Sequence, residues 1–370
     1  MVPARAETGG LPRRQAISLL STGFLTVLGA DVRNPIPSER RRYADPATEF
    51  EVQRLTEPSH NSYLPPNTGK AVARRGNLLI YASDRSGSLQ AYAMDLQSFA
   101  STQLSEAEAL RKETLTLTPD ERWVCYADGD SLWTVQTNGN RARRVYSAPA
   151  GWHLGYTLAV TPDGPAALVA ETGERGQALR MVPLGKGSPS TVFEAPGPIE
   201  ALQPRPRRAA VLYRGAEDSL WLAELPAGRQ IRLKTAGPAG PARWHPEGRS
   251  LLYLRLPQAA GETSSLRELT PDTGEDKLIG QTSQFHEFTM NGDASVFLGA
   301  SHSVAAPYML LLLRVARREL TLCEHRNSGA ARVEPTFAPD SQRIYFVSDR
   351  HGKPAIYTMV VDRLVEKTDT

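Results

Sequence analysis

Histidine and cysteine, the residues that most often act as bases and nucleophiles near neutral pH, are few in this chain and stand far apart. Seven histidines and two cysteines are spread over 370 residues. The sequence contains no Walker-type glycine-rich loop, no serine nucleophile elbow and no Cys-x-x-Cys pair, the motifs that bind phosphates, activate a serine or exchange disulfides. Nucleotide hydrolysis, serine hydrolysis and dithiol redox chemistry are therefore not predicted.

Trp152, His153 and Tyr156 form a group of aromatic and imidazole side chains in the stretch GWHLGY. Their rings would offer a stacking surface for a sugar. Aromatic residues in such a turn also pack between neighbouring elements. The sequence leaves both interpretations open.

The two cysteines, Cys125 and Cys323, lie in strand-like stretches. A free cysteine in such a context usually behaves as a small buried apolar residue. A disulfide between them would need an oxidising compartment, and the sequence does not decide whether it forms.

The elements that would position these residues are short strands joined by turns. Residues 338–357, APDSQRIYFVSDRHGKPAIY, begin with Pro339-Asp340, which has turn chemistry. Alternating apolar residues then predict two strands of a hairpin, at 344–348 and 355–360. A single hairpin cannot bury its own apolar face, so it requires neighbours.

Weaker copies of this unit recur along the chain. Counting residues 338–357, there are seven, which begin near Arg75, Thr118, Thr161, Pro206, His245, Met290 and Ala338. The spacing is on the order of 40 residues, the length of a four-stranded propeller blade. Helical repeats of that length would show apolar residues at i, i+3 and i+4, and these segments do not. The sequence thus predicts an all-β, seven-bladed β-propeller.

A strand-like segment at residues 50–56 stands alone ahead of the first repeat, whereas the last repeat lacks a clear final strand. We expect this N-terminal strand to complete the last blade, which would close the ring and remove an open edge. The alternative is an ordinary edge strand.

The N-terminus resembles a twin-arginine export signal. Arg13-Arg14 precede an uncharged, weakly hydrophobic run that ends near Ala30. This predicts a signal at 1–30, a linker at 31–49 and the propeller at 50–370, in a periplasmic or secreted protein. An uncleaved anchor or a simple N-terminal helix is the alternative, although the run is short for a membrane span.

The composition is ordinary for a globular protein, with 40% hydrophobic and 22% charged residues. The net charge of +3 is small for this length, so no nucleic-acid partner is predicted. No integral membrane span is expected in the mature form.

Three colinear stretches resemble the oligogalacturonate lyases of pectin breakdown. They are RLTEPSHNSY from residue 54, WHLGYT from residue 152 and LCEHRNSGAARVEP from residue 322, similar to the family's His-containing opening, its Trp-x-Gly-Tyr segment and its Leu-Cys-x-His segment. The likeness covers roughly residues 50–362. More generic copies of the repeat resemble TolB-like propellers, which are mainly interaction proteins.

The resemblance to the lyases implies β-elimination across uronate linkages. A divalent metal such as Mn²⁺ would neutralise the carboxylate while a positioned base removes the neighbouring proton. The site should lie at one mouth of the central channel.

The family's functional positions are only partly retained in this sequence. The resemblance implies metal ligands at His286 and Glu334. At two further ligand positions, Gly329 has no side chain and Arg332 would repel a metal. At the position of the base, Pro241 cannot accept a proton, so the catalytic residue is unknown.

The residues expected to bind substrate are His60, Asn61, His245, His325 and Arg332. His60 and Asn61 belong to the opening segment that resembles the family, and the alternative is a polar loop. His245 and His325 are candidates to replace the lost groups, although a lone histidine in a propeller is more often structural.

We therefore expect an exported propeller that binds or cleaves acidic oligosaccharides, with a possible Mn²⁺ ion and with lyase activity altered or lost. The alternative is a TolB-like, non-catalytic propeller that binds a protein partner. Fold alone does not choose between them.

Overall fold

The computed structural model describes residues 35–74, 77–162, 166–259, 261–282, 284–362 and 364. The expected export signal at 1–30 lies outside these residues and stays a prediction. No helix among the described residues is long and apolar enough to cross a membrane.

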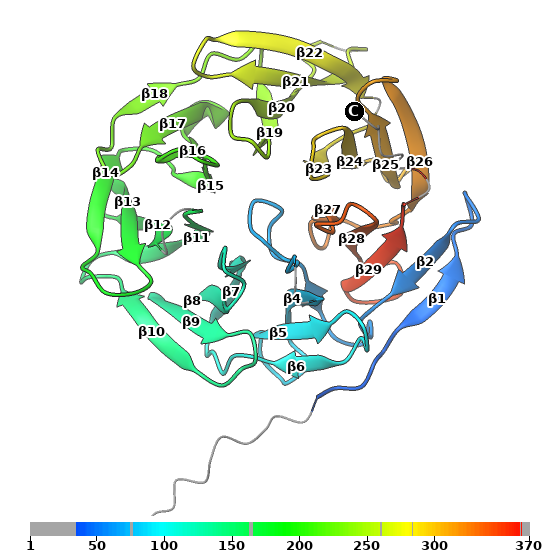
Figure 1. Ribbon diagram of the computed structural model, residues 1–370, viewed down its shortest axis with the longest axis horizontal. Coiled ribbons are helices and arrows are strands. Elements are labelled where there is room, and N and C mark those ends of the chain that lie inside the picture. The colour runs from blue at the N-terminus through cyan, green and yellow to red at the C-terminus, as the bar shows by residue number, and fades with distance from the viewer. Residues whose placement is uncertain are drawn as a thin grey trace, which may run out of the picture. The chain divides into compact units, whose positions relative to one another are not determined.

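Seven antiparallel sheets are arranged around a central axis, as blades of a propeller (Figure 1). Blades 1 to 3 consist of β3 (Ser62–Tyr63), β4 (Leu78–Ser83), β5 (Gln90–Asp95) and β6 (Ser101–Gln103); β7 (Leu110–Leu117), β8 (Trp123–Asp128), β9 (Ser131–Gln136) and β10 (Ala142–Ser147); and β11 (His153–Val160), β12 (Ala166–Gly173), β13 (Gly176–Pro183) and β14 (Ser190–Ala195). The prediction of a seven-bladed propeller is confirmed.

Blades 4 to 6 have the same four-stranded order. They consist of β15 (Glu200–Pro204), β16 (Ala210–Arg214), β17 (Leu220–Glu224) and β18 (Gln230–Arg232), with a 3-10 turn at Ala216–Asp218; β19 (Ala239–Trp244), β20 (Leu251–Arg255), β21 (Ser264–Thr270) and β22 (Glu275–Thr282); and β23 (Glu287–Met290), β24 (Val296–Ala300), β25 (Tyr308–Leu313) and β26 (Arg318–Glu324).

Blade 7 is built from both ends of the described chain. Its strands, in spatial order, are β1 (Arg41–Ala44), β2 (Glu51–Arg54), β29 (Ala355–Val360), β28 (Arg343–Ser348) and β27 (Thr336–Phe337). The strand expected at 50–56 is β2, which pairs antiparallel with β29. Residues 31–49 are not wholly a linker, because β1 adds a fifth strand outside β2.

Apolar side chains of adjacent blades pack against each other. Each blade thereby buries the apolar face that a single hairpin leaves open. Between blades 1 and 2, for example, Ile80 and Ala93 share a cluster with Leu117 and Val124. Both cysteines are free and buried, so neither serves a disulfide, and burial raises the pKa of Cys125 to about 12.

The recurring turn between the first and second strand of a blade contains a residue with positive φ. In the described parts of the chain this residue is Asn77, Glu121, Arg207, Gly248, Ala294 or Ser341, in six of the blades. The preceding aspartate fixes the turn where it is present, since Asp340 Oδ1 accepts a hydrogen bond from the Gln342 amide at 3.0 Å.

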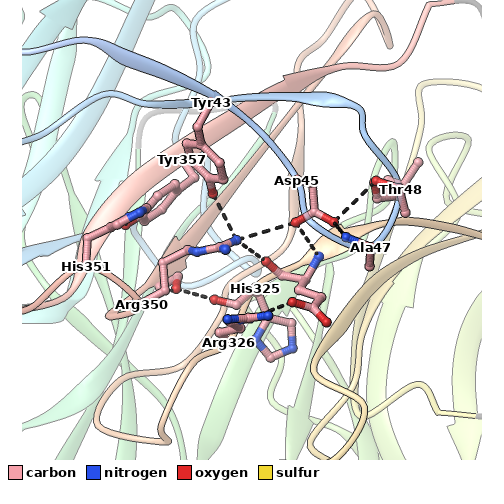
Figure 2. A network of polar contacts seen from close by, with 12 residues as sticks. Tyr43, Asp45, Ala47, Thr48, His325, Arg326, Arg350, His351 and Tyr357 are labelled. Atoms are coloured by element: carbon pink, nitrogen blue, oxygen red, sulfur yellow. Dashed lines mark hydrogen bonds and ion pairs between the residues drawn. The ribbon is translucent and has the colours of Figure 1, made fainter.

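A buried polar network fastens the N-terminal strands to blades 6 and 7 (Figure 2). Arg350 Nη1 donates to the Tyr43 hydroxyl at 3.1 Å and to the Glu324 carbonyl at 2.7 Å, and it lies 3.5 Å from Asp45 Oδ2. Asp45, only 1% exposed, also accepts from the amides of Ala47 and Glu324. These contacts order the chain ahead of β2.

Candidate functional site

A cavity of about 960 Å³ lies where the innermost strands of the blades begin. The innermost strands surround the ring centre in Figure 1, and the first residues of β7, β11, β15 and β19 line the cavity. Each of these four strands has a break in register near its start. Such bulges re-aim side chains, so the cavity wall does not follow simple strand alternation.

Arg332 and Glu334 line one wall of the cavity, and the carboxylate of Glu287 contacts both of them. Arg332 Nε lies 3.3 Å from Glu287 Oε1 and 3.2 Å from Glu334 Oε1. Glu287 Oε2 also accepts from the Glu334 amide at 3.0 Å, and Glu334 Oε2 accepts from the Asn67 amide at 2.7 Å. Blades 1, 6 and 7 therefore meet in this cluster.

The two glutamates are buried side by side, at 7% and 6% exposure. Burial raises the pKa of Glu334 well above its usual range, with a further contribution from Glu287, while the Arg332 guanidinium acts against the rise. The arrangement needs a cation between the carboxylates, and Arg332 supplies it.

Arg243 lies on the cavity wall in β19 and is 9% exposed. Its Nη1 donates to the Ala242 carbonyl at 2.6 Å, and its Nε has no hydrogen-bond partner. Burial lowers the pKa of Arg243 to about 10, so the guanidinium is still charged at neutral pH. The Arg243 guanidinium is thus a buried, charged hydrogen-bond donor at the cavity wall.

Another part of the wall combines an imidazole, an aromatic ring and a guanidinium. His153 Nδ1 lies 2.7 Å from Asp130 Oδ2. Arg111 lies over the Tyr156 ring, at 5.2 Å from its centroid. Although burial acts to raise it, hydrogen bonds from His153 and from the Leu154 amide hold the pKa of Asp130 below its ordinary value. Since Asp130 accepts from Nδ1, the neutral imidazole leaves Nε2 as a free acceptor.

The expected metal ligands do not form a metal centre. His286 is exposed, stacks on His302 with ring centroids 4.4 Å apart, and does not line the cavity. Glu334 is engaged with Arg332 and Asn67. In the described parts of the chain, no group of three or more His, Cys, Asp or Glu side chains is placed to hold an ion. This donor set therefore does not fit a bound Mn²⁺.

Of the five residues expected to bind substrate, only Arg332 lines the cavity. The Asn61 side chain donates to Asp84 Oδ2 at 2.5 Å, within blade 1. His60 lies beside it in the same loop, where its amide donates to the Glu57 carbonyl. His245 accepts from the Glu247 amide in the turn after β19, at the opposite end of that strand from the cavity-lining Ala239.

His325 is 3% exposed and fully bonded. Its Nε2 is 3.2 Å from the Ser301 carbonyl, and its Nδ1 accepts from the Asn327 amide at 3.0 Å. It does not line the cavity, so the structural alternative describes it better than a substrate contact.

Sequence reasoning did not assign the cavity position of Arg243 or the contact of Glu287 with Arg332 and Glu334. Arg243 lies in PARWHPEG, the stretch in which Pro241 occupies the base position, and Pro241 itself lines the cavity. His153 and Tyr156 were marked only as a stacking surface, and both line the cavity. The one available signal was the concentration of rings in GWHLGY.

Comparison with known proteins gives a consistent likeness. No protein-family model matches the chain. It is 21% identical to an oligogalacturonide lyase of Pectobacterium atrosepticum, over 88% of this chain and 96% of the relative, and 21% identical to an oligogalacturonate lyase of Dickeya dadantii, over 85% and 94%. The chain resembles the oligogalacturonate lyases.

Solved structures share the fold. An oligogalacturonate lyase in complex with manganese has a TM-score of 0.82 and 22% identity, over 89% of this chain and 97% of that one. The oligogalacturonate lyase of Vibrio parahaemolyticus has a TM-score of 0.84 and 19% identity, over 91% and 100%. A TolB protein of Agrobacterium tumefaciens has a TM-score of 0.46 over 70% of this chain.

Proposed function

We propose that the central cavity binds acidic oligosaccharides built from uronate units, with oligogalacturonides as the leading ligand. The observation that carries this proposal is the likeness to oligogalacturonate lyases, which extends over 88% of this chain. The lining suits such a ligand, because Tyr63 and Tyr156 offer rings to sugars and several arginines offer donors to carboxylates.

Cleavage by β-elimination needs a base that differs from the family's. The base abstracts the proton on C5, the electron pair forms the C4=C5 double bond, and the C4–O4 bond breaks with protonation of the departing oxygen. Pro241 cannot accept the proton. His153 can, because Asp130 orients its ring and its Nε2 is free. We propose His153 as the base of a slow elimination.

The test is incubation of the full chain with oligogalacturonides, with and without Mn²⁺, while the absorbance of the unsaturated product and the heat of binding are recorded. We expect binding, with slow product formation that falls about 100-fold or more in His153→Gln. His302→Gln is the matched control, since His302 is an exposed histidine that does not line the cavity, and it should leave the rate unchanged.

Binding without product would place the protein among sugar-binding propellers that have lost the elimination. Absence of oligogalacturonide binding under both conditions would overturn the proposal. The protein-interaction alternative would then be the one to pursue.

A further inference from the structure

Two arginines approach the cavity where the resemblance implies a metal. Arg332 stands at an expected ligand position and lies between Glu287 and Glu334. Its side chain is 63% exposed, so the guanidinium has donors free to meet a ligand in the cavity that it lines. Gly329, at another expected position, has open space around it and contributes no donor.

Arg243 is the second cation, and its burial makes it unusual. It lines the same cavity as Arg332 and Glu334, and the charges of Glu334, Arg332 and Glu287 influence its pKa. Among the residues that the structure describes, Nη1 has a hydrogen-bond acceptor in the Ala242 carbonyl, whereas Nε is shielded and has none. Buried polar groups without partners are rare in native proteins. Because Arg243 lines the cavity, a ligand bound there can supply an acceptor to the guanidinium.

We infer that Arg243 and Arg332 form a metal-independent carboxylate site, in which the two guanidinium groups replace a divalent ion. The inference rests on the proposed function and names the group recognised, a uronate carboxylate of the oligosaccharide. The planar guanidinium presents paired N–H donors that match the two oxygens of a carboxylate. Glu287 and Glu334 hold Arg332 in place, whereas Arg243 is left for the ligand.

Calorimetry on the full chain in EDTA tests this, with oligogalacturonide as the acidic probe. The methyl-esterified oligomer and inorganic phosphate test whether a free carboxylate is the group recognised. We expect oligogalacturonide to bind in EDTA, and the neutral ester and phosphate to bind at least about 10-fold more weakly. Arg243→Lys and Arg332→Gln should each weaken oligogalacturonide binding about 10-fold or more, because each substitution removes part of the paired donor geometry.

Arg205→Lys is the matched control, because Arg205 is a buried arginine whose donors are occupied. It bonds the Gly248 carbonyl at 2.7 Å and Asp272 at 2.9 and 2.8 Å, and it does not line the cavity. It should leave binding unchanged. Thermal unfolding of each variant separates a lost site from a lost fold, and Arg332→Lys, at an exposed side chain, serves as the second variant should Arg243→Lys unfold.

The outcomes are distinguishable. Three results would overturn the arginine site while the proposed function stands. They are oligogalacturonide binding only with Mn²⁺, oligogalacturonide binding in EDTA that both arginine variants leave intact, and equal binding of phosphate or the ester. No oligogalacturonide binding with or without Mn²⁺ would overturn the proposed function as well.

Discussion

At the scale of single residues, burial decides what each histidine of the chain can do. His153 is exposed at the cavity with one nitrogen free, whereas His325 has both ring nitrogens bonded inside the protein. The Asn327 amide donates a hydrogen bond to Nδ1 of His325, so a proton on Nδ1 would replace this hydrogen bond by a contact between two N–H donors. The first histidine is available for chemistry, and the second is a structural group.

Burial also gives His325 a measurable effect on stability. It lowers the pKa of His325 from 6.5 to about 4, so between these values the unfolded chain binds a proton that the folded chain does not. The stabilisation of the folded chain by neutral His325 is fully present above pH 6.5 and is lost as the pH falls toward 4. We expect the free energy of unfolding to drop by about 2 kcal/mol more in the wild type than in His325→Gln between pH 7.5 and pH 4.5.

Urea unfolding of both proteins at the two pH values measures this difference. Other titrating groups contribute equally to the two proteins, so only the difference between them reports on His325. If the free energy of unfolding fell equally in the wild type and in His325→Gln, His325 would be protonated in the folded protein or exposed.

At the scale of elements, the described turns between the first and second strands of the blades use one residue with positive φ. Five of the six described positions carry a side chain, and Gly248 is the glycine among them. A Cβ at Gly248 would stand 2.1 Å from the Pro206 carbonyl oxygen of the neighbouring blade. Here glycine is required by close approach of two backbones as well as by φ.

Gly248→Ala should therefore destabilise the protein by about 3 kcal/mol or more, because a backbone atom must move. Gly274→Ala is the control, since Gly274 has a similar φ of 75° and nothing within 4 Å of a Cβ. It should cost only about 1 kcal/mol. Equal losses in denaturant unfolding would show that the contact between the blades relaxes freely.

At the scale of the whole described ring, closure joins residues about 300 positions apart in sequence, as between Ile356 and Thr56. β2 supplies a strand to the last blade, and Arg350 binds Tyr43 and the Glu324 carbonyl (Figure 2). The ring is held both by strand pairing and by a buried ion pair.

Arg350→Ala should lower the free energy of unfolding by about 3 kcal/mol or more, because it leaves Asp45 buried without its cation. Arg42→Ala is the control, since Arg42 and Glu51 are more than half exposed and 3.8 Å apart, and it should change stability by less than about 1 kcal/mol. Denaturant unfolding measures the loss, and limited proteolysis should show earlier cleavage near β1 in Arg350→Ala. Unchanged stability and cleavage would rule out the proposed role of this network in closure.

The fold could be predicted from the sequence because its signals are local. Turn residues, alternation and a repeat length suffice for a blade, and residues such as Pro339 and Asp340 carry them within a few positions. Closure by residues 50–56 followed from counting strands. The sequence lacked any comparable signal for β1, which is ordered by Tyr43 and Asp45 binding Arg350 far along the chain.

The site was decided by tertiary structure. Asn67, Arg243 and Glu334 come from separate blades, and only the closed ring brings them to one cavity, with Glu287 of a further blade bonded to Glu334. The bulges at the cavity ends of the inner strands break the alternation from which side-chain direction is inferred. The sequence by itself therefore determined the propeller and its likeness to a lyase, while ring closure and local register decided which side chains line the cavity.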